Sequence, residues 1–118
     1  MPPSWFRILK AELEYRADKN EEETNVNAFF NDKKVGFILT GHPAILREKM
    51  NAAIIQDTLV EPEHRRKGIG KGLYEKLLEE LPADVHELKG TVQDNAAASF
   101  WQGLGFTLDG NKISKRIR

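Results

Sequence analysis

Cysteine is absent from this chain of 118 residues. The sequence can therefore build neither a disulfide framework nor a metal site with thiolate ligands. A reaction that passes through a cysteinyl intermediate is excluded for the same reason. Folding and chemistry must rely on noncovalent packing and on the oxygen and nitrogen atoms of the other side chains.

An excess of either charge is also lacking, because 18 Lys and Arg residues balance 18 Asp and Glu residues. A site for an anion must then come from local clustering of basic residues. No apolar run approaches the roughly 20 residues that cross a bilayer, and the N-terminus lacks the basic-then-apolar pattern of a secretory signal. We expect one domain over residues 1–118, cytoplasmic, with no membrane, nucleic acid or metal as partner.

Apolar periodicity predicts three helices and six strands. The first helix would place Trp5, Ile8, Leu9 and Leu13 on one face. The predicted helices cover residues 5–13, 69–81 and 97–104, and the predicted strands cover residues 26–30, 35–40, 53–60, 87–92, 106–108 and 112–117. Residues 18–23 and 41–49 are expected to be loops. This order predicts an α+β (α/β layered) domain with one sheet.

The two later helices have recognisable ends. Pro82 ends the first of them, and either Asp94 or Asn95 supplies the N-cap of the second. Gly105 is a C-terminal stop for that last helix.

The loop between the strand at 53–60 and the helix at 69–81 predicts an anion site. Gly68 and Gly70 carry no side chain that would keep a phosphate from the free amides of the first helical turn. Four basic residues surround the same point: Arg65, Arg66, Lys67 and Lys71. A pyrophosphate is the natural occupant. The alternative is a basic helix start whose glycines only allow a tight turn.

Two other phosphate motifs fail on spacing. A Walker loop needs Ser or Thr after Gly-Lys, but Gly72 follows Gly70-Lys71. A dinucleotide fingerprint needs its third glycine one residue further along than Gly72.

Two segments together resemble the GNAT acetyltransferase superfamily. Arg65, Gly68 and Gly70 fit the family pattern Gln/Arg-x-x-Gly-x-Gly/Ala after a strand that ends in Val-x-Pro-Glu. The stretch from Asn95 to Phe106 resembles the later helix of the family, which ends in two aromatic residues, three further residues and Gly-Phe. The resemblance implies one mixed, mostly antiparallel sheet, splayed at its centre, with helices on both faces.

The resemblance also implies acetyl-coenzyme A as cosubstrate, with no metal. Main-chain amides of residues 66–71 would bind its pyrophosphate, and the backbone at Leu59 and Val60 would pair with the pantetheine arm. An N–H group near Leu59 would polarise the acetyl carbonyl. The implied coenzyme-binding residues are Leu59, Val60, Arg65, Arg66, Lys67, Gly68, Ile69, Gly70, Lys71, Asn95 and Trp101.

The acid and the base of the reaction are less well marked. Trp101 stands where many relatives have a Tyr that protonates the leaving thiolate. Its indole N–H could donate a proton, or its ring could simply belong to the core. Phe100 is expected to be a core residue. Tyr74 is a substitute acid or a packing residue. Asp57 is the candidate base, with Glu61 and His42 as alternatives. Alternation predicts that Asp57 shares a face with Ile55 and Leu59.

His64 and His86 are expected to lie on the surface.

The chain is short before its first predicted hairpin, where family members have two helices that wall the acceptor site. The acceptor cleft is therefore expected to be shallow or completed by a second subunit in a homodimer. The sequence favours an N-acetyltransferase in which a small-molecule or protein amine attacks the thioester directly. The alternatives are a non-catalytic coenzyme A or acyl-CoA-binding module and, disfavoured by zero net charge, a nucleic-acid binder.

Overall fold

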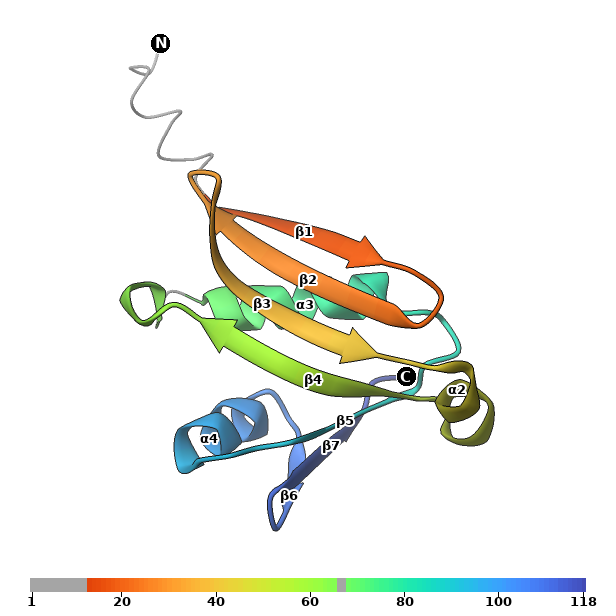
Figure 1. Cartoon of the computed structure of the whole chain (residues 1–118). Helices are drawn as coiled ribbons and strands as arrows, with labels where there is room; N and C mark the ends of the chain where they lie inside the picture. Colours follow the sequence, from red (N-terminus) through yellow and green to blue (C-terminus); the bar gives the residue numbers. More distant parts are fainter. Residues whose placement is uncertain (1–12, 66–67) are drawn as a thin grey trace.

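A computed structural model describes residues 13–65 and 68–118 (Figure 1). Seven strands form one sheet in the order β1-β2-β3-β4-β5-β7-β6, in which only β4 and β5 are parallel neighbours. The strands are β1 (Leu13–Lys19), β2 (Glu23–Phe30), β3 (Lys33–Gly41), β4 (Ala52–Val60), β5 (Glu87–Thr91), β6 (Thr107–Asp109) and β7 (Lys112–Arg116). The predicted mixed, mostly antiparallel sheet is confirmed.

The described helices are α2 (Ala44–Met50), a 3-10 turn (Pro62–His64), α3 (Ile69–Glu80) and α4 (Asn95–Gly103). The sheet opens at its centre, because β4 and β5 pair only from Ala52 to Ile54 and from Glu87 to Lys89. Beyond Ile54 the two strands diverge. The predicted splay is therefore confirmed.

The two longer helices, α3 and α4, lie on one face of the sheet, which we call the inner face (Figure 1). Helix α3 buries Leu73 and Leu77 completely against β2 and β3, next to Val26 and Ile38. We call the opposite side of β1 to β4 the outer face. No helix among residues 13–65 and 68–118 crosses the outer face, and α2 lies at its end (Figure 1).

Two elements were not predicted. Strand β1 covers Leu13 and the first two residues of the expected loop at 18–23. It gave little signal in the sequence because only Tyr15 and Ala17 turn toward the core, between charged neighbours. Helix α2 forms where a loop was expected; it has no buried residue, so apolar spacing gave no signal, and it ends at Asn51 with φ of 50°. The rest of the predicted N-terminal helix lies outside the described residues.

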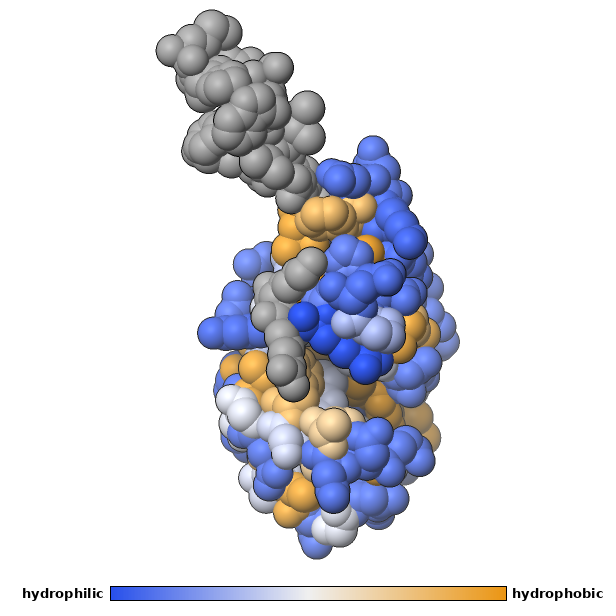
Figure 2. Space-filling view, turned by 90° about the vertical axis from the view of Figure 1, so that its left-hand side faces the viewer, coloured by the Kyte–Doolittle hydropathy of each residue, from blue (hydrophilic) through white to orange (hydrophobic). Residues whose placement is uncertain are grey.

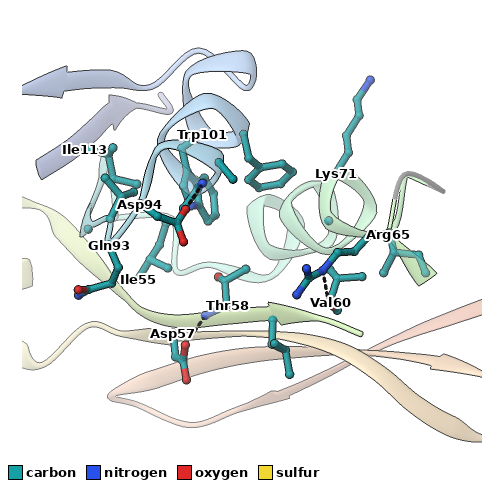
Figure 3. Close-up of a pocket in the computed structure, with 18 of the residues that line it drawn as sticks. Ile55, Asp57, Thr58, Val60, Arg65, Lys71, Gln93, Asp94, Trp101 and Ile113 are labelled. Carbon is teal, nitrogen blue, oxygen red and sulfur yellow. Dashed lines mark hydrogen bonds between the residues drawn. The ribbon is translucent and has the colours of Figure 1, made fainter. Parts of the chain in front are cut away.

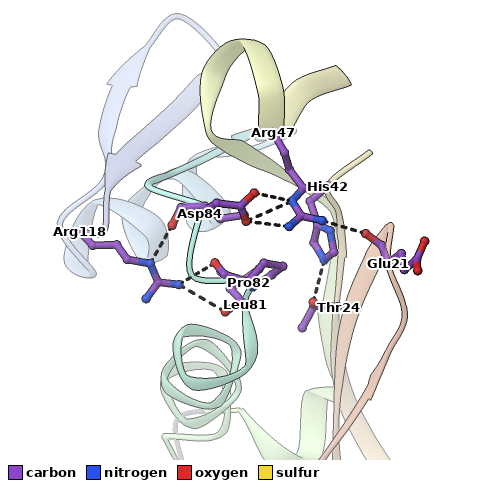
Figure 4. Close-up of polar contacts among 9 residues, drawn as sticks. Glu21, Thr24, His42, Arg47, Leu81, Pro82, Asp84 and Arg118 are labelled. Carbon is purple, nitrogen blue, oxygen red and sulfur yellow. Dashed lines mark hydrogen bonds and ion pairs between the residues drawn. The ribbon is translucent and has the colours of Figure 1, made fainter. Parts of the chain in front are cut away.

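Arginine side chains join the elements at the C-terminal end of α3 (Figure 4). Arg118 donates from Nε to the carbonyl oxygen of Val85 at 2.8 Å and from its guanidinium to that of Pro82 at 3.0 Å. Arg47 of α2 binds the Asp84 carboxylate at 2.8 and 3.0 Å, and this hydrogen bond lowers the pKa of Asp84. These contacts attach α2 and the C-terminus to the loop after α3. None of the described helices is long and apolar enough to span a bilayer.

Gly72, in the middle of α3, allows close packing of the edge strand β1. A Cβ atom at this position would overlap the phenol ring of Tyr15. Tyr15 packs against the core, and burial raises the pKa of its hydroxyl. The third glycine of the basic segment therefore serves the contact between α3 and β1.

We expect Gly72→Ala to lower the free energy of unfolding by about 1–3 kcal/mol, the usual cost of overpacking, although alanine favours helix. The cause is the overlap with Tyr15, so in a Tyr15→Ala background the same substitution should not destabilise. Urea unfolding of the four proteins measures the coupling. An equal loss in both backgrounds would contradict the assignment.

Candidate functional site

A cavity of about 770 Å³ occupies the gap where β4 and β5 diverge. Its walls come from β4, from the loop that leads into α3, from β5 and from α4 (Figure 3). Figure 2 looks at this end of the molecule, where apolar surface is visible in a hollow between two more hydrophilic parts. The unpaired edge of β4 and the start of α3 thus face one cavity.

The start of α3 offers free backbone amides to this cavity. Gly68 is the N-cap residue in the left-handed conformation, with φ of 78°, and no side chain of residues 13–65 and 68–118 caps the helix. The amides of its first turn are therefore left for a ligand, at the positive end of the helix dipole. Arg65, Gly68, Ile69, Gly70 and Lys71 all line the cavity. Arg66 and Lys67 lie outside the described residues.

Gly70 also has a packing role. A Cβ atom there would lie 2.9 Å from two ring atoms of Phe100. The missing side chain therefore lets α4 approach α3, whereas no atom of another described residue lies within 4 Å of the Cβ position of Gly68. Of the two glycines, Gly68 leaves open space beside the helix start, and Gly70 brings the walls of the cavity together.

Alternation along β4 decides which backbone groups face the cavity. The carbonyl oxygen of Val60 accepts a hydrogen bond from Nε of Arg65 at 2.9 Å, and the amide of Thr58 donates to Oδ1 of Asp57 at 2.9 Å. The carbonyl oxygen of Leu59 instead lies toward β3, 2.9 Å from where a Cβ of Gly36 would be. The free edge therefore presents Thr58 and Val60. Thr58 was not among the predicted residues, although neighbours in a strand cannot both face the same gap.

Asp57 does not share a face with Ile55. A bulge in β4 pairs Leu39 with Asp57 and Thr40 with Ile55, which leaves one extra residue between them. Ile55 is buried in the core, while Asp57 is exposed and points away from Trp101 and Ile55 (Figure 3). Asp57 still shares its face with Leu59. A bulge is set by pairing with the neighbouring strand, so alternation alone could not predict it.

Trp101 belongs both to the core and to the cavity wall. Its side chain is 5% exposed, and its ring lies 5.0 Å from Phe100, 5.1 Å from Phe106 and 6.3 Å from Tyr74 between centroids. Trp101 and Phe100 line the cavity, but Tyr74 does not. The buried hydroxyl of Tyr74 has no hydrogen-bond partner among the described residues. Tyr74 therefore acts as a packing residue here.

The N-cap of α4 is Asp94, whose carboxylate accepts a hydrogen bond from the amide of Ala97 at 2.8 Å. Asp94, and not Asn95, is therefore the N-cap residue of α4. Asp94 lines the cavity, whereas Asn95 is an exposed residue of the first turn outside the lining.

The histidines are distributed differently from the expectation. His64, expected at the surface, lines the cavity with its ring centroid 5.2 Å from that of Phe30 and its Nδ1 buried. His42 is fully buried at the far end of β3, where its Nε2 lies 2.8 Å from the hydroxyl of Thr24. His42 and Glu61 do not line the cavity. Half-buried His86 lies beside the start of β5, also outside it.

The arrangement suits an elongated ligand with an anionic end and an amide-containing arm. Basic side chains and free amides lie at one end of the cavity, an unpaired strand edge runs along it, and aromatic rings close one wall. An extended chain that carries amides can hydrogen-bond to such an edge as an added strand.

Comparison with known proteins gives a family match. Residues 1–106 match the model of the acetyltransferase (GNAT) family. Over 58 residues, 48% of this chain, the sequence is 40% identical to GCN5-related N-acetyltransferase 2, chloroplastic, from Arabidopsis thaliana. This chain spans only 22% of the length of that plant protein.

Solved structures share the fold. An acetyltransferase of the GNAT family from Streptococcus pneumoniae superposes with a TM-score of 0.70 at 19% identity, over 85% of this chain and 70% of that one. The PaiA N-acetyltransferase from Thermoplasma acidophilum, solved in complex with coenzyme A, gives a TM-score of 0.66 at 25% identity, over 81% of this chain and 62% of that one.

Gly68→Ala is expected to lower the free energy of unfolding by about 1 kcal/mol, because alanine is strained in the left-handed conformation. Gly103 in α4 is the matched control, since a Cβ there would have no atom within 4 Å and its φ is not in the left-handed region. Gly103→Ala should leave stability unchanged or raise it, as alanine favours helix. Denaturant unfolding compares them, and equal effects would count against a strained Gly68.

Proposed function

Because the chain belongs to the acetyltransferase (GNAT) family, we propose that it transfers an acetyl group from acetyl-coenzyme A to an amine in a ternary complex. The observation that carries the proposal is the unpaired edge of β4 beside the uncapped start of α3, both facing one cavity. The PaiA protein, solved with coenzyme A, supports the choice of donor.

The coenzyme would fit the cavity in one direction. Its pyrophosphate would lie at the start of α3, near Arg65 and Lys71, where amides and positive charge coincide. Its pantetheine amides would pair with the backbone of Thr58 and Val60, which face the gap. The thioester would then lie deeper between β4 and β5, beside Trp101.

The reaction forms a C–N bond and breaks a C–S bond. The lone pair of the neutral amine attacks the acetyl carbon, the coenzyme leaves as a thiolate, and the proton lost by the amine passes to a base or to water. The Thr58 amide is the group on the free edge that could polarise the carbonyl. Asp57 now accepts that N–H, so the carbonyl would displace the carboxylate and free it.

Asp57 remains our candidate for the base. Its carboxylate is exposed on the outer face, so it could take up a proton from an amine that approaches from that side. The indole N–H of Trp101 is the candidate donor to the thiolate. The acceptor would be a small-molecule or protein amine.

A non-catalytic module that binds coenzyme A or acyl-CoA is the second candidate. It is favoured by the buried Trp101 at the position where relatives have an acidic Tyr hydroxyl, and by the Asp57 carboxylate on the Thr58 amide. Both features would slow transfer without preventing binding.

The absence of cysteine makes a direct test simple, because a thiol reagent has no protein background. Incubation with acetyl-coenzyme A and a panel of amines should release free thiol in proportion to the protein added. Heat-treated protein is the control. Stabilisation by coenzyme A without turnover on any amine would favour the binding module, and no thermal shift at all would contradict both candidates.

Lys71→Glu should weaken binding of coenzyme A by about tenfold, since a charge-assisted hydrogen bond contributes about 1.5–3 kcal/mol and solvent screens part of it. Lys49→Glu on α2 changes the net charge equally but lies outside the cavity. Titration calorimetry at two salt concentrations measures both. Equal losses would show that net charge, and not the position of Lys71, matters.

A further inference from the structure

A second cavity, of about 340 Å³, lies next to the point where β4 and β5 part. We call it the groove. Its lining runs from Ile54 of β4 to Asp109 of β6 and includes two lysines and two hydroxyl residues of β5 and β7. Gly90, Thr91 and Ile113 line the groove and the larger cavity alike. The two spaces therefore adjoin at β5.

Four polar side chains of the groove point to the same side of the sheet. Ile113 of β7 is buried in the core, so Lys112 and Ser114 on either side of it point to the outer side. Lys89 pairs directly with Ser114, and Thr91 pairs directly with Lys112. Such partners lie about 5 Å apart, and successive residues on one side of a strand lie about 7 Å apart. The four hydrogen-bond donors therefore surround an area of the size of a carboxylate or phosphate.

The charges around this area favour an anion. Lys112 is exposed, and its ammonium makes no ion pair within the part of the chain that the structure describes. Nζ of Lys89 lies 3.4 Å from a carboxylate oxygen of Glu87, and water reaches both side chains. Asp109 adds a carboxylate to the lining from β6, on the side of Lys112 away from Thr91. Asp109 therefore bounds the groove at its outer strand and does not lie between the two lysines.

The groove lies on the side from which an amine would reach the thioester. Asp57, the candidate base, is exposed on the outer face and also lines the larger cavity. From that cavity the groove continues past Gly90 and Thr91 to β7. An anionic group on Lys112 would lie one to two strand spacings, about 5–10 Å, from an amine in the gap. A short aliphatic chain between the amine and the anion spans this distance.

We propose that the groove selects the acceptor by charge: the acceptor is an amine that carries a carboxylate or phosphate a few bonds from its nitrogen. This inference rests on the proposed transferase function. The anion lies between Lys89 and Lys112 and accepts hydrogen bonds from the hydroxyls of Thr91 and Ser114. A diamine places its second ammonium beside the two lysines instead, and like charges repel. Anionic amines are therefore better acceptors than diamines of the same length.

Three amines of one length test the proposal, because γ-aminobutyrate, γ-aminobutyramide and putrescine end in a negative, a neutral and a positive group. With acetyl-coenzyme A in excess, thiol release should be about tenfold faster with the first than with the second, since a charge-assisted hydrogen bond is the stronger one. It should be slowest with putrescine. Phosphoethanolamine, measured beside them, distinguishes phosphate from carboxylate.

Lys112→Gln should reduce the preference for γ-aminobutyrate over its amide to about threefold, because Lys89 and the hydroxyls remain. Lys49→Gln is the matched control, since Lys49 is an exposed lysine of α2 outside both cavities. It should leave the preference unchanged. The basicity of each amine is the same with every variant, so it cancels from the comparison.

Equal rates with the three amines, or a preference that survives Lys112→Gln, would overturn the proposal and leave the transferase function standing. If no amine is acetylated, nuclear magnetic resonance decides. γ-Aminobutyrate added to isotope-labelled protein with coenzyme A should shift the amide signals of Thr91, Lys112 and Ser114. Such shifts without turnover would keep the groove as a site for anionic amines and count against the transferase. Absence of both turnover and shifts would contradict the groove.

Discussion

The divergence of β4 from β5 is the constraint on which the site depends. After Ile54 pairs with Lys89, β4 runs on for six residues with β3 on one side only. Backbone groups at such an edge need partners, and two of them are satisfied by side chains of this chain. Arg65 donates to the carbonyl oxygen of Val60, and the Asp57 carboxylate accepts from the amide of Thr58. Both contacts are local and exposed, so a ligand with amides can replace them at little cost. The ring of Trp101, packed against its aromatic neighbours, lines the gap.

Three glycines at the start of α3, Gly68 at the N-cap and two within the helix, serve three different physical needs. Gly68 adopts φ of 78° and leaves space at the helix start, Gly70 lets Phe100 of α4 approach, and Gly72 lets Tyr15 of β1 approach. Only the first bears directly on an anion. The other two set the distance from α3 to the elements on either side, which fixes where the helix start points. Packing and binding are therefore combined in one short segment of sequence.

The sequence predicted those parts of the fold that carry strong apolar periodicity: α3, α4, β4 and the two hairpins. It could not predict β1, in which only two residues face the core among charged neighbours. It could not predict α2 either, because that helix buries no residue. At the site, the motif placed Gly68, Ile69 and Lys71 at the cavity. The choice of Thr58 over Leu59 and the orientation of Asp57 depend on pairing with β3 and on its bulge, and such long-range pairing leaves no mark in local sequence.

The two faces of the sheet differ in how completely helices cover them. This difference bears on specificity for the acceptor substrate. On the inner face, α3 and α4 bury a continuous core and fix the donor side of the cavity. On the outer face, the described residues leave leucine and isoleucine exposed beside Asp57. An acceptor that approached from there would meet few groups held rigidly by packing, and rigid groups are what discriminate between similar substrates. Under the proposed function, selectivity for an acceptor that approached from this face would then have to come from groups beyond the packed core.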